Sequence, residues 1–339
     1  YIILCALRKL SGKREVLIPA YTAPSLTLPI TKAGLKYRLV DISLDSFNMD
    51  LEKTVESVSG DTLAVLCVNM FGLPSDIDGL KSGLKTHGSN PFVLEDAASS
   101  FGTRKNGKFS GTFGDIGFLS FNRGKNLSTV SGGLIVTDNE GVIQAIREEV
   151  DKLPQPGFAA KMKIYLSAPG LALAVRPWFY TIFRQLVSGL KHTTLHESFG
   201  SFHYTRLQSS LGCSLIENAE RIFIAREENG RLLYNALEHA PGIRLPVMSD
   251  GWRVVFNQFP ILVEDPRKRM DVVRSIVRAG VEATILYDRP IHKIYGGNSG
   301  CEYPNAEYMA DRLVLIPVHP YMTEKSLQRC IEAVKGAAG

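Results

Sequence analysis

Short apolar runs alternate with polar, periodic stretches along the first 150 residues of the chain. The runs have strand length and end in polar or small residues, which is typical of buried parallel strands. We expect strands at 16–20, 37–42, 62–68, 92–96, 116–121 and 134–137, and helices at 1–10, 49–58, 75–84 and 139–152. Ser75 is expected to cap the third of these helices. The alternation predicts right-handed strand–helix–strand units around a mostly parallel sheet, an α/β fold.

The second half of the chain follows a different pattern. We expect a long helix at 201–237, then the elements of a smaller α+β domain: strands at 252–263, 281–285 and 313–318, and helices at 267–279 and 323–335. Gly280 ends the first of these helices and Thr323 caps the second. We therefore predict a large domain at 1–155, a connecting region at 156–200 and a small domain at 201–339.

The stretch 154–191 is unusually apolar. A helix that spans a membrane needs about 20 uncharged residues, and this stretch is interrupted too often to provide them. The interruptions are Pro169, Gly170, Arg176 and Pro177. Two interpretations stay open: packing at a domain or subunit interface, which the pattern favours, and contact of 163–190 with a membrane surface, which its basic flanks suit.

Composition and charge exclude several classes of function. The chain has 339 residues, of which 45% are hydrophobic and 22% charged, as in an ordinary soluble globular protein with room for two domains. A net charge of +5 without basic runs gives no reason to expect nucleic-acid binding. The five cysteines are scattered, which predicts free thiols in a reducing cytoplasm and no metal site.

The candidate chemistry lies between Phe92 and Thr137. One expected strand ends in two carboxylates, Glu95 and Asp96, and the loop after the next strand holds Lys125. A lysine and an acid at neighbouring strand ends suit pyridoxal phosphate, because the lysine can bind the cofactor aldehyde and the acid can pair with the ring nitrogen. The spacing by itself favours a solvated lysine and a turn-capping aspartate, because motif matches of this kind often arise by chance.

Three motifs in this region carry a family resemblance: EDAASSFG, GTFGDIGFLSF and KNLSTVSGGLIVT. Further matching segments are VLIPAYTAPS, VNMFGLPSDID, RLQSSLG, GVEATILYDRPIH and ADRLVLIPVHPYMTEKSL. Together they resemble the DegT/StrS-type sugar aminotransferases, fold-type I pyridoxal-phosphate enzymes with a large domain and a smaller C-terminal α+β domain. In that family the central segment resembles EDAAQAHG…GSFGDIGCFSF…TKNLGTGEGG.

The resemblance implies roles for four residues around the cofactor. Lys125 would bind it covalently and move protons, and Asp96 would pair with its ring nitrogen. Ser120 stands where the family has a phosphate-binding serine. Ser99 stands where the family has Gln or His beside the phenolic oxygen, so its shorter side chain puts this contact in doubt.

The chain departs from the family at further positions. An aromatic residue that covers the cofactor ring is replaced by Ala23, so Tyr21 or another group must cover it. The family's Asn-Tyr-Arg, which reaches the neighbouring subunit's site, becomes Ser201-Phe202-His203. The resemblance places Tyr287, His292, His203 and Asn69 on the substrate side.

The implied reaction moves an amino group, from glutamate, to a nucleotide-linked keto sugar for surface polysaccharide or aminosugar biosynthesis. Relatives that dehydrate sugars replace the lysine, typically with histidine, so Lys125 favours transamination. The resemblance also implies a homodimer in the cytoplasm, with contact to the inner membrane left open.

Two alternatives remain at this point: a pyridoxal-phosphate enzyme with a different carbonyl substrate, and a non-catalytic relative at a membrane surface. In the family, a Ser-Gly-Thr-type turn precedes the first helix and binds the cofactor phosphate. We expect this turn upstream of Tyr1, outside the sequence.

Overall fold

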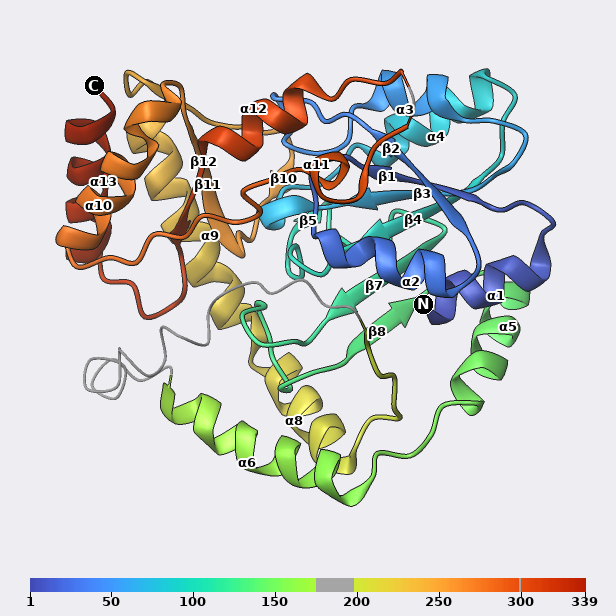
Figure 1. Cartoon of the computed structure of the whole chain (residues 1–339). Helices are drawn as coiled ribbons and strands as arrows, with labels where there is room; N and C mark the ends of the chain where they lie inside the picture. Colours follow the sequence, from blue (N-terminus) through green and yellow to red (C-terminus); the bar gives the residue numbers. More distant parts are fainter. Residues whose placement is uncertain (175–197, 299) are drawn as a thin grey trace.

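A six-stranded sheet forms the centre of the molecule (Figure 1). The structure is a computed structural model and describes residues 1–174, 198–298 and 300–339. In spatial order the strands are β2 (Lys36–Val40), β1 (Glu15–Pro19), β3 (Thr62–Val68), β4 (Phe92–Asp96), β7 (Ile116–Ser120) and β8 (Gly133–Val136). All neighbours pair in parallel except β7 and β8, which are antiparallel. The predicted mostly parallel sheet is confirmed.

The two faces of the sheet belong to different apolar clusters because side chains alternate along a strand. In β1, Val16 and Ile18 join one cluster and Leu17 joins the other. Every residue of β3 is buried, as expected for a strand covered on both sides. The continuous apolar run at 62–68 is the sequence signal of this central position.

Helices cover both faces of the sheet (Figure 1). The N-terminal half contains α1 (Ile2–Leu10), η1 (Pro24–Leu26), α2 (Thr27–Lys32), α3 (Leu51–Ser57), η2 (Met70–Gly72), α4 (Ile77–Thr86) and α5 (Glu140–Asp151). Helix α1 packs against α5, and α3 packs against α4. The N-cap of α4 is Asp76, whose carboxylate accepts from the amide of Gly79, so the expectation for Ser75 was wrong by one residue.

A second, antiparallel sheet lies in the C-terminal half, with the order β12 (Leu313–Pro317), β11 (Gln258–Val263), β9 (Ile243–Arg244). A small third sheet joins β10 (Trp252–Arg253), β5 (Arg104–Lys105) and β6 (Lys108–Phe109). The remaining helices are α6 (Phe158–Ala174), α8 (Arg206–Glu217), α9 (Ala219–Leu237), η3 (Pro266–Lys268), α10 (Arg269–Arg278), α11 (Ile291–Tyr295), α12 (Pro304–Arg312) and α13 (Glu324–Ala338). One apolar cluster runs from α1 through the large sheet to α13, so both sheets share a core.

Two expectations for the C-terminal half were wrong. The helix expected at 201–237 begins at Arg206 and is interrupted at Asn218, which separates α8 from α9. The strand expected at 281–285 is reduced to one bridge between Thr284 and Leu315. The domain division stays a prediction.

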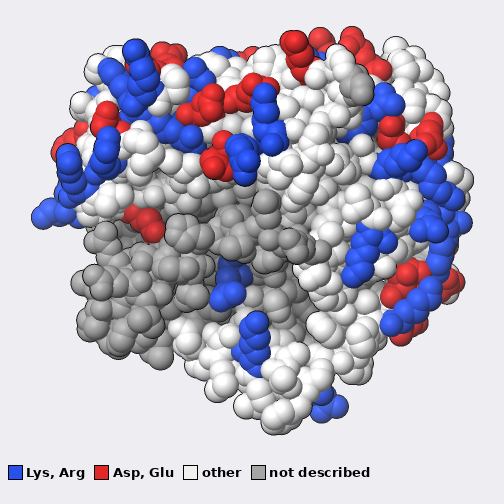
Figure 2. Space-filling view, in the orientation of Figure 1, with Lys and Arg blue, Asp and Glu red and all other residues white. Residues whose placement is uncertain are grey.

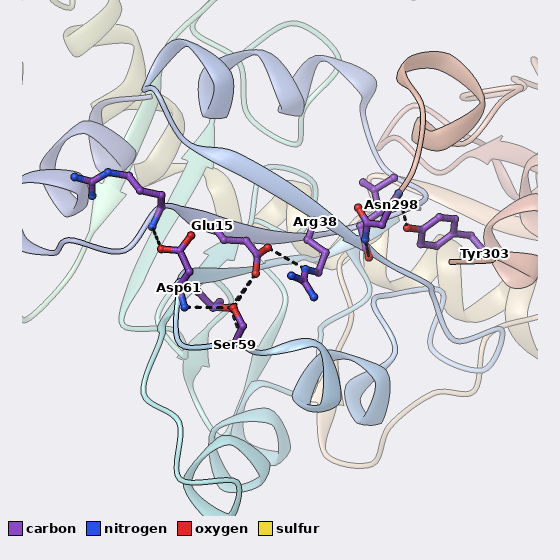
Figure 3. Close-up of polar contacts among 9 residues, drawn as sticks. Glu15, Arg38, Ser59, Asp61, Asn298 and Tyr303 are labelled. Atoms are coloured by element: carbon purple, nitrogen blue, oxygen red, sulfur yellow. Dashed lines mark hydrogen bonds and ion pairs between the residues drawn. The ribbon is translucent and has the colours of Figure 1, made fainter. Parts of the chain in front are cut away.

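Polar contacts hold the edge of the sheet where β1 begins (Figure 3). Glu15 accepts hydrogen bonds from Arg38 on β2, at 2.9 Å, and from Ser59, at 3.3 Å. At the same strand β2, the amide of Asn298 donates to the carbonyl of Leu39, and its backbone amide donates to the hydroxyl of Tyr303. The bond from Asn298 to Leu39 anchors the segment after α11 to the large sheet.

The apolar stretch of the sequence is described only in part. Helix α6 lies at the lower edge of Figure 1, away from the central sheet, and residues 175–197 lie outside the described part. Among the described residues, no helix is both long and apolar enough to cross a bilayer.

Candidate active site

Polar residues meet at the carboxyl ends of β3, β4 and β7. Asp96 is the last residue of β4 and pairs with Val68 on one side and Phe118 on the other. Its carboxylate is buried and accepts a hydrogen bond of 2.9 Å from the backbone amide of Ala98, which fixes its orientation. Carboxyl ends of parallel strands are where α/β proteins place their ligand sites.

The adjacent carboxylate, Glu95, is buried on the other face of the strand. It accepts hydrogen bonds from Asn69, Ser110 and the backbone amides of Phe113 and Gly114, at 2.8–3.2 Å. Because neighbouring side chains in a strand point to opposite faces, only one of the two acids can face the site. Glu95 fastens the turn after β6 against β4 and holds the strand end that carries Asp96.

Lys125 lies in the loop between β7 and β8. Its amine donates a hydrogen bond of 2.9 Å to the hydroxyl of Ser99, which comes from the turn after β4. The loop is held on both sides of the lysine: Asn257 donates to the carbonyl of Gly124, and Asn126 donates to the carbonyl of Phe101. The lysine is thus held by its surroundings and is half-buried.

Burial acts on both charged groups. It raises the pKa of Asp96 above its usual range, while the positive charge of Lys125 opposes this shift. It lowers the pKa of Lys125, and Asp96 opposes that shift in turn. The Lys125 amine is therefore neutral in a larger fraction of molecules, and the neutral amine is the nucleophilic form.

Ser120 ends β7, and its hydroxyl accepts from the amide of Asn122 at 3.3 Å. It lies on the same loop as Lys125 and is half-buried, so its hydroxyl stays within reach of a ligand at this end of the sheet. A hollow of the surface at the opposite end of β4, around Asn90, Thr112 and Asp138, contains none of the predicted residues.

Two tyrosines lie beside this group. Tyr21 follows β1, is fully buried, and donates a hydrogen bond of 2.6 Å to the carbonyl of Leu286. Its ring meets that of Tyr287 edge-on, at 6.1 Å between centroids. Burial, with a smaller contribution from the negative charge of Asp96, raises the pKa of Tyr287 to about 12, so this phenol lies within electrostatic range of Asp96. Ala23 is half-buried at the start of η1 and presents only a methyl group.

The backbone of Tyr287 has a positive φ of 47°. This conformation is unusual for a bulky residue and costs free energy. The hydrogen bond from Tyr21 to Leu286 holds the preceding residue and so helps to maintain it.

Asn69 lies beneath the site. It follows β3, is fully buried, and its amide donates to Glu95 and Ser110 while its carbonyl oxygen accepts from the amide of Ser75. Both polar groups are thus used within the protein. The structure places this side chain in the support of β4 and gives it no free group for a substrate.

The segment before α8 contacts the loop that follows Lys125. Tyr204 shares a hydrogen bond of 2.6 Å with Thr129, and a side chain at Gly132 would collide with its ring. Gln208 donates to the carbonyl and hydroxyl oxygens of Ser131 and also closes a capping box with Thr205. These contacts bring the half-buried His203 near this loop.

His292 belongs to α11, which meets β1 where the amide of Ile291 donates to the carbonyl of Ala20. Its Nε2 lies 2.9 Å from a carboxylate oxygen of Glu307, and its ring packs on Tyr303 at 4.8 Å. Its Nδ1 is buried and has no hydrogen-bond partner among the described residues.

Comparison with known proteins identifies the family. The family model of the DegT/DnrJ/EryC1/StrS aminotransferases matches residues 2–335. The chain belongs to this family. It is 32% identical over 326 residues to a GDP-perosamine synthase of Escherichia coli O157:H7, a match that covers 94% of this chain and 78% of the relative. The resemblance predicted from the sequence is confirmed.

Solved structures of the DegT/DnrJ/EryC1/StrS family have the same fold. The sugar aminotransferase CalS13 from Micromonospora echinospora superposes with a TM-score of 0.77 at 22% identity, covering 99% of this chain and 84% of that one. The GDP-4-keto-6-deoxy-D-mannose-3-dehydratase of E. coli, solved with bound hydrated PLP, superposes with a TM-score of 0.74 at 18% identity, covering 98% and 84%. The fold-type I architecture is confirmed.

Sequence reasoning missed several residues that build the site of this family member. Glu95, Tyr204 and Gln208 hold the strand end and the lysine loop, yet none received a role. Strand alternation could have separated Glu95 from Asp96. The capping-box spacing of Thr205 and Gln208 could have marked Gln208 as a helix-start residue, but not its contact with Ser131. No local signal points to Tyr204, because Thr129 lies 75 residues away.

Proposed function

We propose that this chain is a pyridoxal-phosphate-dependent aminotransferase that moves an amino group from glutamate to a nucleotide-linked keto sugar. Pyridoxal phosphate is the cofactor of the family. The observation that carries the proposal is the half-buried Lys125, which is hydrogen-bonded to Ser99 and interacts electrostatically with the buried Asp96. The product would serve surface polysaccharide or aminosugar biosynthesis.

The described residues fit the cofactor. Among them no basic side chain forms an ion pair with Asp96, so a protonated ring nitrogen would offset the cost of burying this carboxylate. The hydroxyl of Ser120 would bind the phosphate, and Ser99 would lie beside the phenolic oxygen. Tyr287 would supply the aromatic face that Ala23 lacks, with Tyr21 supporting it from behind.

When bound, the cofactor supplies an electron sink for the carbon next to the transferred nitrogen. Lys125 would bind its aldehyde carbon through Nζ and, once released, would move the proton at the donor's α-carbon. Its lowered pKa favours the neutral amine that can accept this proton. His292, through its free Nδ1, and the phenol of Tyr287 would contact the sugar side of the substrate.

Covalent attachment tests the proposal directly. Wild-type protein with pyridoxal phosphate should show a visible absorbance band that borohydride converts to a permanent adduct. Lys125→Ala should show neither, and Lys85→Ala, which changes an exposed lysine on α4, should match wild type. A band of equal strength in Lys125→Ala would contradict the assignment.

Substrate identity needs a second measurement. Nucleotide-linked keto sugars would be offered with glutamate, and the amino sugar product detected by mass. The changes at Ala23, Ser99, Ser201 and His203 favour, as a second candidate, the same chemistry on a different carbonyl substrate. A protein that binds the cofactor covalently and converts to the amino form with glutamate, yet aminates no keto sugar, would support this candidate.

We also propose a homodimer located in the cytoplasm. Family sites are built from two chains, and several apolar side chains near the lysine loop are exposed in the single chain: Leu134, Phe202, Leu207 and Ile216. Light scattering would measure the mass in solution. Replacement of Leu207 and Ile216 by serine should then convert a dimer to a monomer.

A further inference from the structure

Helix α6 has no place in the core of the protein. It packs closely against none of the other described helices and strands, and it lies at the edge of the view in Figure 1. Phe158 is 81% exposed and Leu166 is 68% exposed, and Tyr165 is exposed as well. Apolar side chains of this size, held together in water on one element, mark an interaction surface.

The exposed side chains form one stripe. Phe158, Tyr165 and Leu166 are spaced i, i+7 and i+8, so they lie on the same face of the helix. At 100° per residue, Lys161 falls on one side of this stripe and Lys163 on the other, and both are exposed. Lysines in this position can lay their alkyl stems along an apolar surface and keep their ammonium groups at its polar boundary.

The charge around the stripe has a single sign. From Lys152 to Ala174 the chain has no Asp or Glu, and the charged residues of α6 are two lysines. The lower edge of the molecule, where α6 lies, shows white and blue residues and no red in Figure 2. The partner of this surface should therefore be apolar inside and negatively charged at its boundary.

A second copy of α6 does not meet this description. In a two-fold contact of the stripe with itself, four lysines would meet and no carboxylate of the helix would compensate them. An anionic bilayer has both properties: its acyl chains can pack against the apolar stripe, and its lipid phosphates can pair with the lysines. We propose that α6 docks this protein on an anionic membrane surface.

The helix would lie along the membrane and not cross it. Lys161 and Lys163 come within its first two turns, where a crossing helix would have to bury both charges. Ile164 to Gly170 carries no charge, so this part of the helix can sink to the boundary of head groups and acyl chains. The central sheet and Lys125 would stay in water, with access to soluble substrates.

Vesicle flotation tests the proposal with the cofactor-loaded protein. Wild type should float with vesicles of phosphatidylcholine and phosphatidylglycerol in equal parts and stay behind with phosphatidylcholine alone. Lys161→Gln/Lys163→Gln should weaken binding on the order of 30-fold, since each lysine near an anionic surface contributes a factor of about five. Phe158→Ser/Leu166→Ser should weaken it on the order of 100-fold.

Two matched variants keep the test specific. Lys85→Gln/Lys325→Gln removes the same charge from α4 and α13, and Met270→Ser/Val277→Ser removes exposed apolar side chains from α10. Both should bind vesicles as wild type does. The proposal is overturned if wild type ignores anionic vesicles, if the matched variants lose as much binding, or if the α6 variants change only the mass measured by light scattering.

Discussion

The amine of Lys125 donates a hydrogen bond of 2.9 Å to the hydroxyl of Ser99. The family motif EDAAQAHG has Gln at the position of Ser99. In this chain the serine instead holds the lysine in place. The hydrogen bond also stabilises the charged form of an amine whose burial favours the neutral form.

Ser99→Ala should therefore lower the pKa of Lys125 further and make the amine more reactive at neutral pH. Covalent attachment of pyridoxal phosphate should accelerate roughly two- to tenfold, since a typical hydrogen bond contributes about 0.5–1.5 kcal/mol. Stopped-flow absorbance over a range of pH would measure this rate and should place its midpoint at a lower pH. Ser210→Ala, on the exposed side of α8, is the control. A midpoint that moves upward would show that Ser99 does not stabilise the ammonium form.

Asp96→Asn should make the cofactor-free protein more stable at neutral pH while it weakens cofactor binding. Burial raises the pKa of Asp96, so the charged carboxylate lowers the free energy of unfolding wherever it is ionised in the folded protein. Asparagine keeps the oxygen that accepts from Ala98 and removes the charge. Urea unfolding of both proteins without cofactor would measure the difference.

The pH dependence of this difference has a defined sign. Between the usual pKa of 3.8 and the raised value, the folded state binds a proton that the unfolded state has lost, so the stability of wild type rises as pH falls through this window. The advantage of Asp96→Asn should shrink over the same window and vanish below pH 3.8. An advantage that persists there would have another origin.

Local patterns predicted the part of the site that local structure builds. The run 92–96 is a buried strand because it is apolar and short, and its last residue is Asp96 at the sheet edge. The neighbouring run 116–121 placed Ser120 in the same way. That Lys125 and Asp96 lie near each other could be inferred from chain order, because the ends of adjacent strands lie at the same edge of the sheet.

The remainder depends on partners far along the chain. Tyr287 has a positive φ in the loop after Thr284, which forms only one bridge where a strand was expected. The hydrogen bond from Tyr21, which follows the first strand, holds the neighbouring Leu286. The interruption at Asn218 has no breaker residue such as proline to announce it. Helical periodicity continues through that position, so the sequence predicted one helix.

Glu95→Gln should lower the free energy of unfolding by about 3 kcal/mol. All the described partners of Glu95 donate hydrogen bonds to it, so the NH₂ group of a glutamine would face donors and leave them unpaired. The donors include the backbone amides of Phe113 and Gly114, which have fixed directions. Urea unfolding would measure the loss. Glu52→Gln, in the first turn of α3, should cost far less.

Val130→Gly should stabilise the protein by up to about 1 kcal/mol. Val130 has a φ of 74°, which costs a β-branched residue about 1–2 kcal/mol. Glycine removes this strain, but it loses more conformational entropy on folding, which offsets part of the gain in stability. The family motif TKNLGTGEGG has glycine at the matching position. Thermal unfolding would compare Val130→Gly with Val136→Gly, a strand position that should lose stability. Equal losses in both would show that the strain is not relieved.

The bond between Tyr21 and Leu286 joins residues 265 positions apart and crosses from the first strand to the segment beside the second sheet. With one apolar cluster running through both sheets, neither half can keep its shape while the other is unfolded. The protein should lose its cofactor and its structure in one transition. Inactivation and unfolding would then be the same event, and evolution of the loop that contains Tyr287 would be limited by the stability of the whole chain.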